Sequence, residues 1–153
     1  APCARVGHRN SSSLMLGDEL EPVQRLRARI AALLPGLGPG HCFEPLALTR
    51  YAAGGFYSRH ADGRRATVLV YLDGEGAVGG ATSFPSLGLR VPPSPGSALL
   101  FFPTFADGRR KAEMVHVAEE LRAGVKVVAQ QWIDLPGQRD CPEEAPSGED
   151  SAG

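Results

Sequence analysis

The stretch R-Y-A-A-G-G-F-Y-S-R-H-A-D, residues 50–62, ends in a His-x-Asp pair formed by His60 and Asp62. The pair follows a Tyr-containing strand pattern, and side chains at i and i+2 of a strand point to the same face. A third imidazole, His116, comes from a distant segment, and Lys126 follows it by ten positions. Two histidines and one carboxylate are typical of the facial triad of non-haem Fe(II) sites, and Lys126 is then placed to hold an acidic co-substrate.

Length and composition limit the function classes. The 153 residues indicate one domain, and 42% of hydrophobic residues suffice for a core. The net charge of −1 favours neither nucleic acid nor an anionic membrane as a partner. No apolar run is long enough to span a bilayer. Because the sequence begins with Ala1 rather than Met, we expect a processed chain or a fragment whose targeting segment is out of view. The compartment (secretory lumen or cytoplasm) and the oligomeric state stay open.

Hydrophobic periodicity predicts one helix followed by many strands. Over residues 18–34, Val23, Leu26, Ile30 and Leu33 recur at helical spacing. Further along, the period changes to two, and Gly, Pro and Asp divide the pattern into short segments. The predicted strands are 43–51, 55–60, 66–72, 89–92, 97–102, 113–117 and 125–133.

Many short strands separated by turns predict a mainly β (α+β) fold, a sandwich or jelly-roll barrel with the helix packed outside. We assign residues 1–138 to this domain. Residues 139–153 are acidic and rich in Pro, Ser and Gly, so we expect a disordered tail. Cys3, Cys42 and Cys141 lack CxxC spacing, which argues against a zinc ribbon and leaves their disulfide state open.

Both candidate features have a plain alternative. A His-x-Asp pair arises by chance in many chains, and His60 and Asp62 would then be a hydrogen-bonded pair in a loop. Lys126 shares one face of its predicted strand with Gln130 and Trp132. If that face is exposed, Lys126 is simply solvated. If it points into a barrel, the buried ammonium needs an anionic partner, such as the carboxylate of a co-substrate.

Six motifs occur in order between Arg9 and Ile133. They are R-N-S-S-S (9–13), R-Y-A-A-G-G-F-Y-S-R-H-A-D (50–62), R-R-A-T-V-L-V-Y-L (64–72), G-G-A-T-S-F-P (79–85), P-G-S-A-L-L-F-F (95–102) and H-V-A-E-E-L-R-A-G-V-K-V-V-A-Q-Q-W-I (116–133). Together they resemble the catalytic domain of prolyl 4-hydroxylases, members of the Fe(II)/2-oxoglutarate dioxygenase superfamily. The resemblance implies a double-stranded β-helix, or jelly roll, that uses Fe(II), 2-oxoglutarate and ascorbate as reductant.

The resemblance also implies roles for individual positions. The catalytic, metal-ligating residues would be His60, Asp62 and His116. The 2-oxoglutarate site would consist of Lys126, Tyr51 and Thr82. The positions that face the peptide substrate would be Tyr57, Trp132 and Arg64, with Arg65 as the rival of Arg64. The aromatic residues among them also suit an ordinary barrel core, because aromatic side chains fill such interiors.

The implied reaction is hydroxylation of proline in a peptide, coupled to decarboxylation of 2-oxoglutarate to succinate and CO₂. The chain departs from the family pattern in three places. Its N-terminal portion is short, and a strand and a helix that usually precede the Arg9 region are missing. Only Gly63 separates Asp62 from Arg64, where the family has a long loop that helps to close over the substrate. Glu119 and Glu120 stand where the family has Pro-Val, and they add charge near the site.

Three other functions stay open. The first is an oxygenase of the same superfamily that acts on another side chain or a small molecule, which the short loop favours. The second is a catalytically inactive β-helix binding module, which an intact triad with Lys126 argues against. The third is a zinc hydrolase, which would not need Lys126. The basic clusters 64–65 and 109–111 either steer an acidic substrate or are solvated loop faces.

Overall fold

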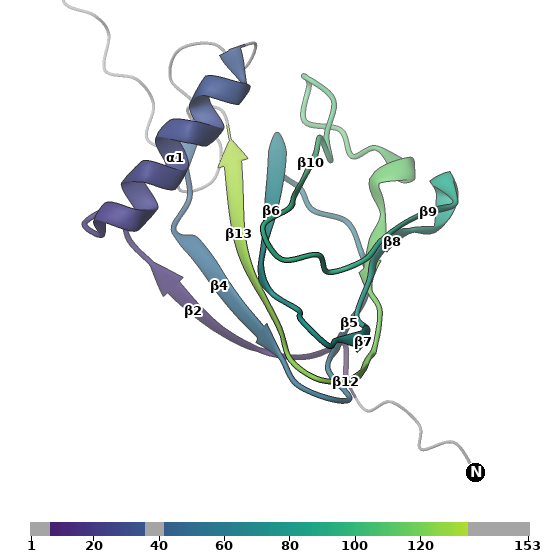
Figure 1. Cartoon of the computed structure of the whole chain (residues 1–153). Coiled ribbons are helices and arrows are strands. Elements are labelled where there is room, and N and C mark those ends of the chain that lie inside the picture. Colours follow the sequence, from purple (N-terminus) through teal and green to yellow (C-terminus); the bar gives the residue numbers. More distant parts are fainter. Residues whose placement is uncertain (1–6, 36–41, 135–153) are drawn as a thin grey trace, which may run out of the picture.

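The computed structural model describes residues 7–35 and 42–134 of the chain. In this part, two antiparallel β-sheets face each other and one helix covers the outside of the larger sheet (Figure 1). The larger sheet has the strand order β10-β6-β13-β4-β2. Its strands are β2 (Ser12–Leu16), β4 (Leu46–Tyr51), β6 (Ala66–Asp73), β10 (Ala98–Phe101) and β13 (Lys126–Asp134), and β3 (Cys42–Phe43) pairs with the end of β13.

The smaller sheet has the strand order β1-β5-β11-β8-β9. Its strands are β1 (Arg9–Asn10), β5 (Phe56–His60), β8 (Thr82–Phe84), β9 (Leu89–Val91) and β11 (His116–Ala118). A separate pair joins β7 (Val78–Gly79) to β12 (Leu121–Ala123), and two 3₁₀ turns are η2 (Pro85–Leu87) and η3 (Ala112–Met114). The predicted mainly β, jelly-roll fold with an outer helix is confirmed.

Strand β6 shows how the larger sheet separates a polar interior from an apolar exterior. Its side chains alternate, as the period of a strand requires. Tyr71 points inward, where its hydroxyl donates a hydrogen bond to Oγ1 of Thr82 on the opposite sheet. Val68 points outward and packs against Ile30 of the helix. The space between the sheets is therefore available for functional side chains, while the outer face completes the core.

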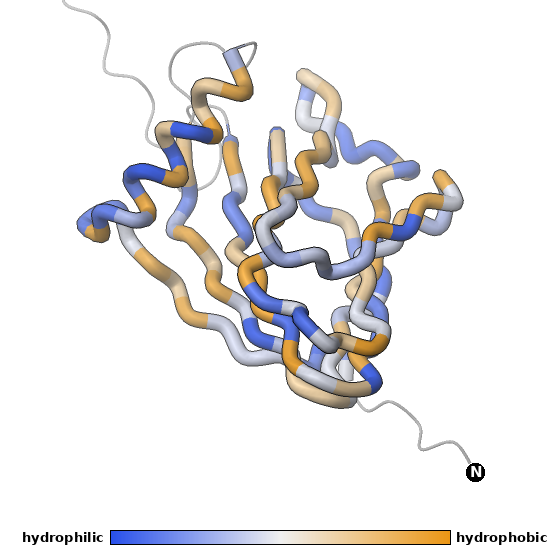
Figure 2. Tube along the Cα trace, in the orientation of Figure 1, coloured by the Kyte–Doolittle hydropathy of each residue, from blue (hydrophilic) through white to orange (hydrophobic). Residues whose placement is uncertain are grey.

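The helix α1 (Glu21–Leu33) confirms the prediction over 18–34, and it begins three residues later than predicted. Figure 2 shows that apolar and polar residues alternate along it. Val23 packs with Leu46 and Ala129, and Ile30 packs with Ile133, so the apolar stripe covers β4 and β13. The helix therefore covers the outer face of the larger sheet, while the pairing of β13 with β4 and β6 sets the register of β13, which carries Lys126.

The predictions for several short segments were wrong. The pattern predicted no strand before residue 43, but β1 and β2 form within 9–16 and extend both sheets. The pattern also missed β7, β8 and β12 as strands, because strands of two or three residues contain too few positions to show a period. The predicted strand 113–117 is a 3₁₀ turn up to Met114, and β11 begins only at His116.

Some predictions fall partly or wholly outside the described residues. The acidic tail 139–153 does so entirely, and the domain boundary at 138 stays a prediction. Cys42 is part of a disulfide bond, whereas Cys3 and Cys141 are not among the described residues. In the described part, no helix combines the length and the apolar character needed to cross a membrane.

Candidate metal centre and active site

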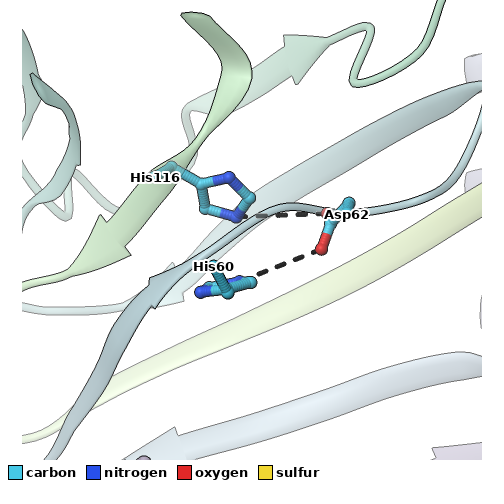
Figure 3. A group of neighbouring side chains, drawn as sticks. All are labelled: His60, Asp62 and His116. Atoms are coloured by element: carbon cyan, nitrogen blue, oxygen red, sulfur yellow. Dashed lines mark ion pairs between the residues drawn. The ribbon is translucent and has the colours of Figure 1, made fainter. Parts of the chain in front are cut away.

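Two histidines and one aspartate meet between the two sheets. His60 ends β5 and His116 begins β11, and the two residues are direct partners in the smaller sheet. Asp62 lies in the connection after β5 and points toward both rings (Figure 3). Its Oδ1 lies 3.8 Å from Nε2 of His60, and its Oδ2 lies 4.0 Å from Nε2 of His116. One ligand atom from each residue lies within 4.8 Å of the others, which suits a single metal ion.

Asp62 reaches this point in a way that the sequence did not predict. The i, i+2 rule placed His60 and Asp62 on one strand, but β5 ends at His60. The carboxylate is held instead by donors from two strands of the larger sheet. Thr67 Oγ1 donates to Oδ2 at 2.9 Å, and Trp132 Nε1 donates to the same oxygen at 3.4 Å. Among the described residues, Oδ1 receives no hydrogen bond, so it is the oxygen that suits a metal.

Both imidazoles are oriented by backbone carbonyls. His60 Nδ1 lies 2.8 Å from the carbonyl oxygen of Ser58, and His116 Nδ1 lies 2.9 Å from that of Met114. Because a carbonyl oxygen only accepts, each Nδ1 must carry the hydrogen. Each Nε2 then presents its lone pair to the space beside Asp62, which is the tautomer that a metal ligand needs.

Burial favours the neutral form of His60. Burial and the neighbouring His116 lower the pKa of His60 to about 4, and Asp62 and the Ser58 carbonyl offset only part of this effect. The imidazole is therefore neutral near pH 7 without any bound cation. The donor set of two imidazoles and one carboxylate fits the facial triad of non-haem Fe(II).

An irregularity in β5 turns Tyr57 toward the cluster. The pairing of β5 with β11 shifts register between His116 and Ala118, which pair with His60 and Tyr57. A β-bulge re-aims a side chain in this way, so two residues at i and i+3 share one face. The rings of Tyr57 and His60 stack with centroids 3.6 Å apart. Tyr57 thus covers one side of the metal cluster.

A cavity connects the cluster to a buried ammonium group. Lys126 lines it together with His60 and His116 and is 2% exposed, which rules out the solvated alternative. Its Nζ donates to the carbonyl oxygen of Gly80 at 2.6 Å and lies 4.7 Å from the ring centroid of Tyr51. Within the described chain, Lys126 forms no ion pair. Burial lowers its pKa to about 8, because the buried ammonium has lost its hydration. A carboxylate that enters the cavity would supply the counter-ion that this ammonium lacks.

The two other predicted co-substrate residues line the same cavity. Tyr51 is the direct partner of Lys126 between β4 and β13, and burial raises the pKa of its hydroxyl. Thr82 is 2% exposed, and its Oγ1 accepts the hydrogen bond from Tyr71. The cavity therefore brings a cation and hydroxyl groups together with His60 and His116 of the cluster, and these are groups that can bind a carboxylate.

The predicted substrate-facing residues Arg64 and Trp132 lie on the other side of Asp62. The Arg64 side chain forms a two-pronged ion pair with the buried Glu44, one contact of which is 2.9 Å. Its guanidinium also lies 5.2 Å from the ring centroid of Trp132. The rival Arg65 donates instead to the carbonyl oxygen of Thr104. Arg64 is thus the arginine that contacts the cluster, through Trp132.

Sequence reasoning missed three residues that support the site. Thr67 and Glu44 hold Asp62 and Arg64, and no spacing rule connects residues on different strands. Arg9 was quoted as part of a motif without a role. Its guanidinium bonds the hydroxyls of Ser11 and Ser13 and lies 4.9 Å from the ring centroid of Tyr57. Arg9 and Thr67 both lie in quoted motifs, and this was the sequence signal for them, whereas Glu44 lies in none and needed the fold.

Comparison with known proteins agrees with this geometry. Residues 46–134, more than half of the chain, match the 2OG-Fe(II) oxygenase superfamily. Human prolyl 4-hydroxylase subunit alpha-1 is 33% identical over 150 residues, which cover 87% of this chain and 28% of that protein. The chain therefore spans little more than a quarter of the length of this relative.

Two solved structures share the fold. The viral collagen prolyl hydroxylase of Paramecium bursaria Chlorella virus-1, in its 2OG complex, has a TM-score of 0.78 and 28% identity, covering 84% of this chain and 81% of that one. A prolyl hydroxylase from Trichoplax adhaerens, in complex with a hypoxia inducible factor peptide fragment, has a TM-score of 0.64 and 18% identity, covering 85% and 66%. Fe(II) and 2-oxoglutarate are the metal and co-substrate of the matched family. With its fold, its His-Asp-His cluster and this match, the chain belongs to the 2OG-Fe(II) oxygenase superfamily.

Proposed function

We propose that this chain is a dioxygenase that hydroxylates proline in a peptide and decarboxylates 2-oxoglutarate to succinate and CO₂. The observation that carries the proposal is one cavity that is lined both by His60 and His116 of the His-Asp-His cluster and by the buried Lys126. The similarity to prolyl 4-hydroxylase subunits supports proline as the target.

The metal would be held by His60, Asp62 and His116. Their two Nε2 atoms and the Oδ1 atom converge, and Thr67 and Trp132 occupy the second carboxylate oxygen. Fe(II) bound there, with 2-oxoglutarate and dioxygen, supplies the oxidation that puts one oxygen atom into a C–H bond and the other into succinate. Ascorbate is the reductant expected to keep the iron as Fe(II).

Lys126 would bind the distal carboxylate of 2-oxoglutarate. A desolvated ammonium that has only the Gly80 carbonyl as partner gains a charge-assisted hydrogen bond when a carboxylate arrives. Tyr51 and Thr82 would line the same pocket and exclude water from the pair. This contact selects a dicarboxylate of the right length over a simple keto acid.

The peptide would approach the face on which Tyr57 and Trp132 flank the ligands. Tyr57 stacks on His60, and Trp132 bonds Asp62, so both rings border the position where a reacting C–H group must sit. Arg64, fixed by Glu44, would bond a peptide carbonyl beside Trp132. These groups orient the substrate, and they do not take part in proton transfer.

One observation keeps a second candidate function. The connection from β5 to β6 comprises only residues 61–65, so little chain is available there to close over a peptide. An oxygenase of the same superfamily with another side chain or a small molecule as substrate would also fit such an open site.

The test is succinate formation by the purified protein with Fe(II), ascorbate and 2-oxoglutarate, with and without a proline-rich peptide. We expect the peptide to stimulate succinate and to gain one oxygen atom on proline. His60→Ala and Lys126→Ala should lose both signals, whereas Arg59→Ala, an exposed neighbour on β5, should keep them. Succinate without peptide stimulation would favour the second candidate. Absence of both succinate and metal binding would reject the oxygenase itself.

A further inference from the structure

A second, apolar groove opens behind the metal cluster, between the ends of the two sheets. It has a volume of about 270 Å³ and is lined by residues of β8, β9 and β10. Figure 1 shows where these three strands lie. Strand β9 ends the smaller sheet and β10 ends the larger one, so in the described chain each has one side without a strand partner. Edges of this kind are available to bind an extended segment.

Large apolar side chains line this groove and remain exposed. Leu87, Leu89 and Leu100 keep 50%, 46% and 39% of their surface accessible. Scattered exposed leucines are ordinary, but three in one groove form a contiguous apolar surface of the kind that marks an interaction site. Covering them with an apolar side chain is favourable, at about 25 cal/mol for each Å² removed from water.

The floor of the groove is also the support of His116. Phe84 and Phe101 line the groove, and their ring centroids lie 5.5 and 4.9 Å from that of His116. Met114 lines it too, and its carbonyl oxygen accepts the Nδ1 hydrogen of His116. Only one layer of side chains therefore separates the groove from the metal cluster. A segment bound in the groove would therefore contact the side chains that support His116.

The rim of the groove is positively charged. Lys111 is the one charged residue among those lining it. Arg110 precedes Lys111, and in the described part of the chain neither has an acidic partner. Arg109 is already paired with Asp107 at 2.6 Å. The nearest acid along the chain, Glu113 in η3, can offset only one of the two cations Arg110 and Lys111. The rim therefore keeps a net positive charge. An acidic side chain is the complementary partner for this rim.

We propose that the groove is a substrate subsite that binds a large apolar side chain followed or preceded by an acidic residue, close in sequence to the hydroxylated proline. The inference rests on the proposed peptidyl hydroxylase function. An extended peptide advances about 3.3 Å per residue, so the number of residues between the apolar residue and the proline measures the distance from the groove to the reacting proline. The substrate class is then an apolar and acidic peptide segment, not a uniform proline repeat.

The test is a set of single-proline peptides in which leucine and glutamate are moved stepwise away from the proline. The kcat/KM for the hydroxylated product should be highest at one spacing and fall roughly tenfold when the leucine becomes alanine, as expected for one buried leucine side chain. Leu89→Ser and Leu100→Ser should reduce kcat/KM for the best peptide by a similar factor. Leu72→Ser is the matched control, because Leu72 is 51% exposed away from the groove.

Charge reversal tests the rim separately. Lys111→Glu should weaken binding of the glutamate peptide, measured by fluorescence anisotropy, and a lysine peptide should recover the loss. Arg29→Glu on α1 is the control for a change of net charge. All variants should keep the peptide-independent turnover of 2-oxoglutarate, which shows that the metal cluster is intact.

The outcomes separate the two proposals. If peptides are hydroxylated but their kcat/KM is the same in the parent and in the groove variants, the groove inference is wrong and the hydroxylase proposal stands. If no peptide is hydroxylated, both proposals fail. If the parent is a dimer that Leu100→Ser converts to a monomer without an effect on peptides, the groove is an interface between copies and the inference is also wrong.

Discussion

Replacing Lys126 with methionine removes a buried charge and keeps most of the side-chain volume. Burial lowers the pKa of Lys126 from its ordinary 10.5 to about 8. A difference of about 2.5 pKa units, at about 1.4 kcal/mol per unit, means that the folded state disfavours the ammonium by roughly 3 kcal/mol near neutral pH. Loss of the hydrogen bond to Gly80 destabilises the variant by about 1 kcal/mol and so offsets part of this gain. We therefore expect Lys126→Met to raise the free energy of unfolding of the ligand-free protein by roughly 2 kcal/mol.

The same substitution should weaken co-substrate binding. Removing one partner of a buried charge pair costs roughly 2–5 kcal/mol, so the Kd for 2-oxoglutarate should rise at least about 30-fold. Urea unfolding at pH 7 measures the first effect, and calorimetric titration of 2-oxoglutarate with Mn(II) in place of iron measures the second. The exposed Arg122 on β12 provides the control, since Arg122→Met should change neither quantity by more than about 0.5 kcal/mol.

The pH dependence fixes the cause of the stability gain. The unfolded lysine holds its proton up to a pKa of 10.5, whereas the folded one loses it above about 8. Between these values the unfolded state binds more protons, so the stability of the parent rises with pH and the advantage of Lys126→Met shrinks. A variant that is less stable than the parent at pH 7, or that binds 2-oxoglutarate equally well, would refute this reasoning.

Three further predictions concern the site. Thr67→Val removes the hydroxyl that bonds the cluster carboxylate, and Mn(II) titration should show roughly 10- to 100-fold weaker binding; equal affinity would contradict the orienting role. The affinity for 2-oxoglutarate, titrated calorimetrically, should fall as pH rises through about 8, where Lys126 loses its proton. Glu119→Gln should move this fall to lower pH, because Glu119 raises the pKa of Lys126. An affinity that does not change with pH would contradict the role of Lys126. Gly80→Ala should lower both the melting temperature and the 2-oxoglutarate affinity, because the new Cβ would lie 2.9 Å from a leucine side chain, whereas Gly76→Ala, at the same φ of +71° in open space, should affect affinity little.

The fold was predictable from sequence where elements are long. The 13 residues of α1 and the nine of β13 contain several periods, so their positions and faces were predicted correctly. The alternation also put Lys126 on the face of Gln130, and the structure places both on the same cavity. Two- and three-residue strands such as β1 and β12 depend on pairing with distant segments, and no local pattern specifies them.

The site was predictable as a set of residue types, but its geometry was not. His60 and Asp62 lie close together, as predicted. The predicted reason, that both lie on one strand, was wrong, because β5 ends at His60. Its position depends on Thr67 and Trp132, which come from other strands. The bulge that turns Tyr57 toward His60 likewise results from pairing with β11. Tertiary contacts of this kind carry no signal in the sequence around the residue that they position.

The most direct test of the oxygenase assignment is turnover under ¹⁸O₂, with mass spectrometry of both products. The account predicts one labelled oxygen atom in the hydroxylated proline and one in succinate, in equal amounts, with both lost in His60→Ala. Hydroxylated proline and succinate that both lack the label, while the protein binds metal and 2-oxoglutarate, would contradict a dioxygenase centred on His60, Asp62 and His116.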